Sequence, residues 1–295
     1  MLQQSIGFIG LGNLGLPMAT NLAMRSWRVV VHDQDADRSA KAREVGGEPA
    51  EDVRALAACD YLCLAVPDGA AVSSVLLDQG LLDALPPRAV VLVHSTVLPE
   101  TAVDLAERCA AKGVAFLDAP VSGGAARARA GELTTMVGAS TDSLERGRAV
   151  LEDACTAIVH VGPPGAGAAV KLANQLMLFS ALAGAYEAMS LAQAYGVDED
   201  RVLSAVGTGT GASWASDNWG FYDKLSADYD EAAVPPEHRP WSKDLLDVVR
   251  AAEDRQLPAP LAALLSGVLP VAVRRHAEQA RSAVPQSAAS VQGGR

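Results

Sequence analysis

Basic residues, cysteines and aromatic residues are scarce in this sequence of 295 residues, and the shortage of basic residues already argues against polyanionic partners. Lysine and arginine number 24 against 35 aspartates and glutamates, so the formal net charge is −11. An acidic chain binds polyanions poorly, and we expect neither nucleic acid nor a membrane surface as a partner. Because no stretch of about 18 apolar residues is free of charges, the sequence predicts no transmembrane helix. The N-terminus has no basic region or cleavage site of a secretory signal, which favours a cytoplasmic protein.

Cysteine is too rare for a disulfide framework, since four cysteines are spread over the whole chain. Cys59 and Cys63 lie in an apolar, strand-like segment, which favours small buried side chains. A zinc pair is the alternative, but the spacing is not CxxC and no second pair would complete four ligands. The five histidines are scattered and no HExxH motif occurs, so we expect no metal.

What the chain does contain is apolar residues, at 49%, and in the first half they occur in short runs separated by helical stretches. The runs are rich in valine, isoleucine and leucine without alternation, which is typical of strands buried on both faces of a parallel sheet. Strand and helix alternate, so we predict an α/β fold with a doubly wound parallel sheet. The predicted strands are 5–10, 28–33, 61–66, 89–95, 114–120, 133–138 and 155–162, and the predicted helices are 14–25, 50–58, 99–112 and 141–153.

After the turn-rich GPPGAG at 162–167 the pattern becomes helical. A helix over 168–195 is apolar almost all round, which predicts burial in a core or between subunits, hence a homodimer or homotetramer. We place an α/β domain over 1–163 and an all-helical domain over 164–295. Within the second, we predict helices at 198–206, 242–256 and 259–275, loops and short helices over 207–241, and a disordered tail over 282–295.

A GxGxxG motif directly follows the first predicted strand and opens the first predicted helix. Its glycines allow a tight turn, close approach of the backbone to a pyrophosphate, and close packing of helix on strand, as in Rossmann dinucleotide sites. The phosphates bind at the helix N-terminus, where free N–H groups and the helix dipole favour an anion. The expected cofactor contacts in this motif are Gly10, Gly12, Asn13, Leu14 and Gly15.

Asp33 ends the second predicted strand, where the Rossmann fingerprint has a carboxylate. That carboxylate binds a ribose 2′-hydroxyl and repels a 2′-phosphate. The next residue is Gln34 rather than an arginine, and Arg38 is further on, so the sequence favours NAD over NADP as the cofactor.

Two later segments carry candidate substrate chemistry. The Ser-Gly-Gly turn of DAPVSGG (118–124) can point backbone N–H groups at a carboxylate, although an ordinary strand-to-loop turn reads the same way. Lys171 shares one face of the long helix with Asn174 and Gln175, three and four positions on. Its apolar flanks would lower its pKa toward that of a general base if it is buried, whereas a lysine reaching the surface is the alternative.

Together the motifs resemble those of the β-hydroxyacid dehydrogenase family, in the same order and from residue 5 to about 275. The matching segments are GFIGLGNLGLPMATNL, HSTVLPE, DAPVSGG, GAGAAVKLANQ and WSKDL. The resemblance implies an NAD-dependent oxidoreductase that moves a hydride between nicotinamide and a small β-hydroxy acid, such as 3-hydroxyisobutyrate, or its semialdehyde.

The resemblance also implies roles for individual residues. Lys171 would be the general acid/base, and the helical domain would supply part of the substrate site and the subunit contacts. The implied substrate-binding residues are Ser122, Gly123, Gly124, Asn174 and Gln175, and the implied further cofactor-binding residues are Val66, Pro67, Thr96 and Lys243.

The sequence departs from the family pattern at two positions. Gln175 replaces the second of two asparagines after the lysine, which puts the usual small substrate in doubt. Arg127 stands where the family often has glycine, either at the pocket rim or as a surface arginine.

Six of the 13 aromatic residues lie between 214 and 241, either lining a pocket for a bulkier acid or forming a core or interface. An imine or other carbonyl reductase of the same architecture, and a non-catalytic dinucleotide-binding module, are the alternative functions.

Overall fold

Two compact units, Met1–Leu172 and Ala173–Arg295, make up the chain in a computed structural model that describes residues 4–283. The division falls inside a long helix, α8 (Ala166–Ala194), rather than before it at residue 163. The start of this helix is hydrogen-bonded to Asp118 of the α/β unit through Gly165 and Ala168, and the division lies nine residues later than predicted. Most of the tail predicted to be disordered, 284–295, lies outside the described residues.

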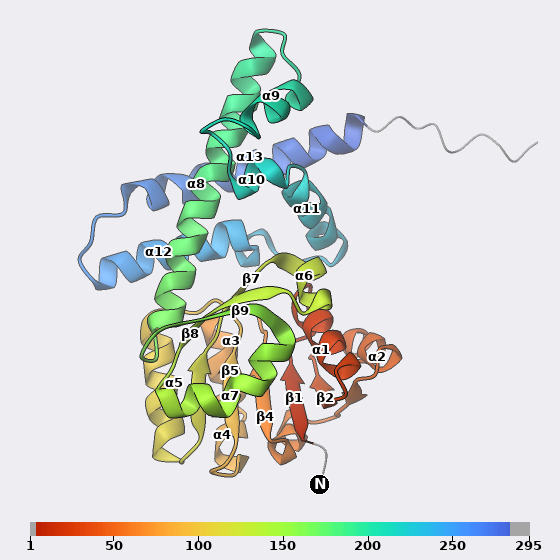
Figure 1. Ribbon diagram of the computed structural model, residues 1–295, viewed down its shortest axis with the longest axis vertical. Helices are drawn as coiled ribbons and strands as arrows, with labels where there is room; N and C mark the ends of the chain where they lie inside the picture. Colours follow the sequence, from red (N-terminus) through yellow and green to blue (C-terminus); the bar gives the residue numbers. More distant parts are fainter. Residues whose placement is uncertain (1–3, 284–295) are drawn as a thin grey trace, which may run out of the picture. The chain divides into compact units, whose positions relative to one another are not determined.

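A nine-stranded sheet forms the centre of the first unit, in the order β3-β2-β1-β4-β5-β6-β8-β7 with β9 paired to β8 (Figure 1). The strands from β3 to β6 are parallel throughout. Parallel neighbours place their carboxyl ends at one edge, where open α/β sheets bind ligands. The strands are β1 (Ser5–Ile9), β2 (Arg28–His32), β3 (Glu48–Pro49), β4 (Tyr61–Leu64), β5 (Val90–Val93), β6 (Ala115–Asp118), β7 (Val121–Ser122), β8 (Leu133–Gly138) and β9 (Cys155–Gly162).

The far side of the sheet is mixed, since β8 runs antiparallel to β6 and β7 and parallel to β9. Only the short helix α6 (Gly124–Ala130) connects β7 to β8. A parallel pair needs a crossover of about a dozen residues or more, so this connection suits antiparallel pairing. The predicted doubly wound architecture is confirmed, with this antiparallel addition.

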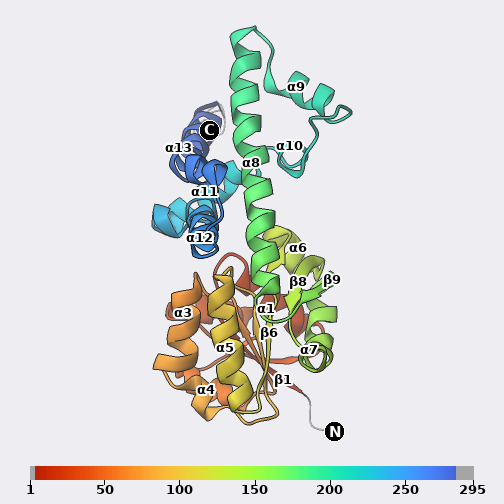
Figure 2. The same ribbon diagram turned by 90° about the vertical axis from the view of Figure 1, so that its left-hand side faces the viewer.

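Side chains on the two faces of the sheet build two separate hydrophobic cores, with helices on both sides (Figure 2). Along β5, Val90 and Leu92 enter one core while Val91 and Val93 enter the other, so the strand is apolar at every position. One core is covered by α1 (Gly15–Met24), α6 and α7 (Thr141–Ala154), and the other by η1 (Val53–Ala58), α3 (Gly69–Ser73), η2 (Ser74–Asp78), α4 (Leu81–Ala84) and α5 (Pro99–Ala111).

Several short helices of this unit were not predicted from the sequence. The clearest is α2 (Ala36–Glu44), which buries only Ala42 and therefore has no apolar periodicity to signal it. Its start is marked instead by the Asp35 side chain, which accepts the N–H of Asp37. The helix predicted over 50–58 is the 3₁₀ helix η1.

The described part of the second unit is helical. Its core joins α8 to α11 (Phe221–Glu231), α12 (Pro240–Asp254) and α13 (Pro260–Ala283) through buried side chains such as Phe179, Tyr222 and Trp241. The rings of Tyr222 and Trp241 lie 5.8 Å apart, edge to face. The aromatic-rich segment thus contributes to the core of this unit. The remaining elements are α9 (Glu199–Val206), α10 (Trp214–Asp217) and η3 (Pro236–His238).

Helix α8 is the one helix of the described chain that is long and apolar enough to cross a membrane, judged by length and composition alone. The sequence predicted no such segment, because this helix contains the charged residues Lys171 and Glu187. A core helix of a globular protein passes the same test, so this single helix is weak evidence of a membrane span.

Candidate active site

The glycine motif forms a tight turn between β1 and α1. Gly10 has a φ of +89° and donates its N–H to the His32 carbonyl at 3.0 Å. A Cβ on Gly15 would collide with the Gly10 carbonyl, whereas one on Gly12 would meet only Arg38. The first and third glycines therefore serve the turn and the packing of helix on strand, and the second has open space around it, which is compatible with a ligand close to the backbone. Between them, Asn13 is exposed and Leu14 is half-buried at the start of α1.

Asp33 lies directly beside this turn. Its carboxylate accepts the Leu11 N–H at 2.6 Å and the Asp35 N–H at 2.9 Å. Arg38, which the sequence places further along the chain, is brought back by α2, and its Nη1 lies 3.8 Å from Asp33 Oδ2. A glycine turn that opens a helix, with a carboxylate at its rim, fits the pyrophosphate and ribose of a dinucleotide.

The loops after β4 and β5 extend the same edge of the sheet. The hydroxyl of Ser95 donates to the Val66 carbonyl at 2.8 Å, which ties the two loops together. Pro67 is exposed and Thr96 is half-buried on these loops. The predicted cofactor residues Val66 and Pro67 thus follow β4, which pairs with β1, the strand before the glycine turn. Thr96 follows β5, which pairs with β4.

His94 lies between β5 and these loops, and the sequence predicted no function for it. Its ring is buried and stacks on Phe8, with centroids 6.4 Å apart. Burial lowers the pKa of His94 to about 4, so the ring is neutral near pH 7. A neutral ring facing the Ala119 carbonyl at 2.9 Å must donate from Nδ1. Its Nε2 is buried with no hydrogen-bond partner among the described residues.

Lys171 and the Ser-Gly-Gly turn meet in the first unit. Lys171 is only 8% exposed, and its Nζ donates to the Val121 carbonyl at 2.9 Å. The side chain is therefore buried rather than extended to the surface. Val121 directly precedes Ser122 in β7, and Gly123 and Gly124, with φ of +139° and +75°, turn the chain into α6. The structure thus places a buried amine beside the predicted carboxylate-binding turn.

Arg127, one turn into α6, is exposed. This position agrees with the surface-arginine interpretation of its departure from the family pattern.

The remaining predicted site residues lie in the second unit and belong to one hydrogen-bonded network. Asn174 donates to Gln175 Oε1 at 3.0 Å, and Gln175 Nε2 donates to the buried Asp244 at 2.6 Å. Lys243 lies 2.8 Å from Asp244 and 3.0 Å from Asp247. The longer side chain of Gln175, compared with asparagine, is thus held by the carboxylate of the KDL motif.

The charge of Lys243 is set by two opposing effects. Burial alone would lower the pKa of Lys243, but the carboxylates of Asp244 and Asp247 outweigh burial and raise it above its usual value. Lys243 is therefore a fixed positive charge near neutral pH rather than a proton carrier.

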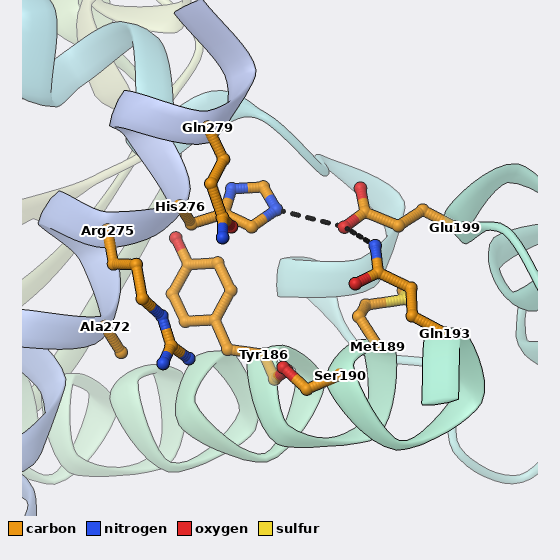
Figure 3. A pocket seen from close by; sticks show the side chains of 9 residues that line it. All are labelled: Tyr186, Met189, Ser190, Gln193, Glu199, Ala272, Arg275, His276 and Gln279. Atoms are coloured by element: carbon orange, nitrogen blue, oxygen red, sulfur yellow. Dashed lines mark hydrogen bonds and ion pairs between the residues drawn. The ribbon is translucent and has the colours of Figure 1, made fainter. Parts of the chain in front are cut away.

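A second polar cluster in this unit, which the sequence did not reveal, surrounds His276 on α13 (Figure 3). His276 Nδ1 lies 2.7 Å from Asp223 and Nε2 lies 3.3 Å from Glu199, so the ring connects three helices. The hydrogen bond to Asp223 is the main cause of its raised pKa. The adjoining cavity of about 20 Å³ has room for one water molecule but not for a substrate. The cluster is therefore structural.

Two further side-chain classes bear on the chemistry. All four cysteines are buried free thiols, which agrees with the interpretation of Cys59 and Cys63 as small buried residues. Within residues 4–283, no three histidine, cysteine or acidic side chains group in a way that could hold a metal ion.

Two family models together match almost the whole chain. One, described as the NAD binding domain of 6-phosphogluconate dehydrogenase, matches residues 5–162. The other, described as NAD-binding of NADP-dependent 3-hydroxyisobutyrate dehydrogenase, matches residues 165–285.

Curated relatives include dehydrogenases of small hydroxy acids. A 3-hydroxyisobutyrate dehydrogenase of Pseudomonas aeruginosa is 38% identical over 71% of this chain and 71% of its own. An NAD-dependent L-serine dehydrogenase of the same organism is 36% identical over 72% of each chain. An uncharacterized oxidoreductase of Mycobacterium tuberculosis is 41% identical over 65% of this chain, which spans 66% of that relative's length.

Solved structures give the same picture over nearly the full length. Mycobacterium tuberculosis 3-hydroxyisobutyrate dehydrogenase with L-serine has a TM-score of 0.77 at 27% identity, over 94% of both chains. A complex of Psf3 with NADP⁺ and 2-OPP has a TM-score of 0.75 at 26% identity, over 95% of both. A Streptomyces aurantiacus imine reductase, with a TM-score of 0.66 at 21% identity over 94% and 95%, shares the fold alone.

Proposed function

This chain belongs to the 3-hydroxyisobutyrate dehydrogenase family, and from that premise we propose that it is an NAD-dependent oxidoreductase of a small β-hydroxy acid or its semialdehyde. The observation that carries the proposal is the position of Lys171. Its buried amine donates to the Val121 carbonyl, one residue before the Ser-Gly-Gly turn that begins at Ser122. A proton carrier beside an anion-binding turn is the arrangement that a hydroxy-acid dehydrogenase needs.

Lys171 acts on the proton of the reaction. A bound nicotinamide dinucleotide supplies the hydride acceptor, or the donor in the reverse direction. During oxidation the neutral amine of Lys171 accepts the hydroxyl proton, and during reduction the ammonium returns it to the developing alkoxide. The Ser122 hydroxyl and the backbone N–H groups of Gly123 and Gly124 hold the substrate carboxylate, which orients the hydroxyl-bearing carbon.

The substrates named for similar proteins share one chemical group. 3-Hydroxyisobutyrate and L-serine both carry a hydroxymethyl group and a carboxylate on the same carbon, and differ in a methyl or an ammonium substituent. We therefore propose a 2-substituted 3-hydroxypropanoate as the substrate class. Gln175, which on sequence puts the usual small substrate in doubt, donates to Asp244, and we propose that the 2-substituent is the part of the substrate that differs from the family's usual one.

NAD is the proposed cofactor. The Asp33 carboxylate at the rim of the glycine turn supports this preference, because it would repel a 2′-phosphate. Arg38 partly offsets that repulsion, since its guanidinium lies beside Asp33. We therefore propose NAD as the better of two usable cofactors rather than the exclusive one.

The proposed function is tested by following absorbance of reduced nicotinamide with NAD and a panel of acids. The panel contains 3-hydroxyisobutyrate, L-serine, glycerate, 4-hydroxybutyrate, threonate and phenylserine. We expect turnover with the 2-substituted 3-hydroxypropanoates. No turnover with any acid, although NAD binds, would contradict the proposal, and reduction of a cyclic imine by NADPH would favour the imine reductase alternative.

We also propose that the chain forms a homo-oligomer through its helical unit. On α13 the exposed apolar residues Leu261, Leu264, Val268 and Val271 follow a 3-4-3 spacing, which is the seam of a helix that packs against a partner. On α8, Met177 and Leu191 are also exposed and lie two heptads apart. A groove of about 200 Å³ runs between the two helices past Val268 and Val271. A second copy of this chain would cover this apolar surface.

Charge placed in this seam should separate the subunits. We expect the wild type to have the mass of two or four chains by light scattering, and the double variant Leu264→Glu/Val268→Glu to shift to one chain. Met24→Glu, which charges an even more exposed apolar residue of the first unit, is the control and should not dissociate. A wild type that is monomeric at micromolar concentration would refute this proposal.

A cytoplasmic location remains a prediction from the sequence.

A further inference from the structure

We propose that Asp118 is a positioning residue that fixes the first turn of α8 and thereby the amine of Lys171, an inference that rests on the proposed function. Asp118 ends β6 and begins the DAPVSGG segment. It does not contact the reacting atoms, and its action is exerted through the helix that carries Lys171.

The Asp118 carboxylate caps a helix that is distant in the sequence. Oδ1 accepts the Gly165 N–H at 2.9 Å, and Oδ2 accepts the Ala168 N–H at 2.8 Å. The side chain is completely buried. The first N–H groups of a helix have no partner within the helix, and the helix dipole favours a negative charge there. Asp118 supplies both the acceptors and the charge, from about 50 residues away in sequence.

Two glycines make room for this contact. A Cβ on Gly167 would lie 2.5 Å from the Met136 carbonyl oxygen and 2.6 Å from that of Asp118. A Cβ on Gly138 would overlap the Asp118 carboxylate. The backbone of α8 can therefore approach β6 and β8 this closely only because both positions lack a side chain. This packing explains why the glycines of GAGAAVKLANQ precede the lysine.

The same short segment of chain holds Lys171 at a second point. Ala168, bound by Asp118, lies one helical turn before Lys171, and the Lys171 amine donates to Val121, three residues after Asp118. The helix is thus attached to 118–121 by its backbone and by its catalytic side chain. Loss of the first attachment would let the turn shift and move the amine relative to the carboxylate-binding turn. A displacement of 1 Å at a reacting group can lower a rate by about 10²-fold.

Ionisation of the buried Asp118 carboxyl lowers the stability of the folded protein, and this effect can be measured as a pH dependence of folding. Burial raises the pKa of Asp118 to about 6, although the N–H groups of Gly165, Ala168 and Gly167 act in the opposite direction. The folded state therefore binds the proton more tightly than the unfolded chain does, where the pKa is 3.8. The stability contributed by the protonated group is fully present below about pH 4 and is lost as the pH rises through about 6.

The test compares wild type, Asp118→Asn and Gly167→Ala, with Asp52→Asn as the matched control. Asp52 also caps a helix of the first unit, η1, by accepting the Arg54 N–H, and it is exposed at the surface. An asparagine at 118 has the same shape but can accept at only one of its two atoms, so one N–H of α8 faces an NH₂ group. We expect kcat to fall about 10²-fold in Asp118→Asn and Gly167→Ala. NAD affinity and substrate KM should stay within about threefold of wild type, and Asp52→Asn should match wild type.

A merely structural role would lower the amount of folded enzyme without this selective loss in kcat. An Asp118→Asn enzyme that folds and keeps wild-type kcat would overturn the proposal. Should both variants fail to fold, amide hydrogen exchange of the wild type decides: Gly165 and Ala168 should be protected at pH 7, and exchange as fast as exposed amides would overturn it.

Two further readouts separate this inference from the proposed function. Exchange protection does not depend on the substrate, so it can confirm the anchor even if no acid of the panel is turned over. Titration is the second: between pH 4 and 7 the folding equilibrium constant of the wild type should fall, relative to that of Asp118→Asn, by about 10²-fold. Equal pH profiles would show that the Asp118 carboxylate is not desolvated by α8, which contradicts the inference.

Discussion

Lys171→Ala should lower kcat by about 10² to 10⁴-fold while NAD still binds with wild-type affinity. The loss follows from removing the proton acceptor for the substrate hydroxyl, since the Lys171 amine is the one held next to the Ser-Gly-Gly turn by its hydrogen bond to Val121. Cofactor binding should survive, because Lys171 contacts Val121 in β7 rather than the glycine turn after β1. The measurements are steady-state kinetics with the best acid of the panel and titration of NAD by quenching of tryptophan fluorescence.

Lys112→Ala is the control for this prediction. Lys112 is an exposed lysine of the same unit, paired with Asp83 at the surface. Its loss should leave kcat unchanged. If Lys171→Ala retained more than a tenth of wild-type kcat with a chemically limited rate, another group would be carrying the proton, and the role assigned to Lys171 would be wrong.

Asp33→Asn should lower the preference for NAD over NADP by about 10²-fold, measured as the ratio of kcat/KM values. An amide retains an acceptor for the Leu11 N–H, so the glycine turn should keep its shape. It removes the charge that repels a 2′-phosphate and one of the two carboxylates paired with Arg38, the other being Asp35, which makes Arg38 more available to that phosphate. The NAD value should fall because a charged acceptor for the ribose hydroxyl becomes a neutral one.

Asp37→Asn provides the comparison for Asp33, because Asp37 is an exposed acidic residue in the first turn of the neighbouring helix α2. Its cofactor ratio should stay close to that of the wild type. A wild type that already prefers NADP, or an unchanged ratio in Asp33→Asn, would show that Asp33 does not select the cofactor.

Local pattern was sufficient to predict the parts of the fold that depend on neighbouring residues. The parallel strands were recognisable because every position of β5 or β4 is buried on one face or the other, which leaves an uninterrupted apolar run. The glycine turn was recognisable because strand, turn, helix and Asp33 follow one another closely. Helix α2 was missed because its residues are almost all exposed.

Contacts between distant segments could not be predicted in the same way. Asp118 was visible as part of a motif, but nothing in the sequence shows that it caps a helix beginning almost 50 residues later. Gln175 and Asp244 are 69 positions apart, and the partners of His276 lie 53 and 77 positions away. Arg38 reaches Asp33 only because a polar helix with no apolar pattern folds it back. Each of these contacts depends on how elements pack, which residue spacing does not encode.

The most direct test of the central claim is the fate of the hydrogen on the hydroxyl-bearing carbon. The enzyme is incubated with NAD and an acid of the panel that carries deuterium on that carbon, and the mass of the reduced cofactor is measured by mass spectrometry. A hydride transfer assisted by Lys171 predicts reduced cofactor that is one mass unit heavier and a slower rate with the labelled acid. Deuterium released into water, or reduced cofactor without the label, would contradict a β-hydroxyacid dehydrogenase.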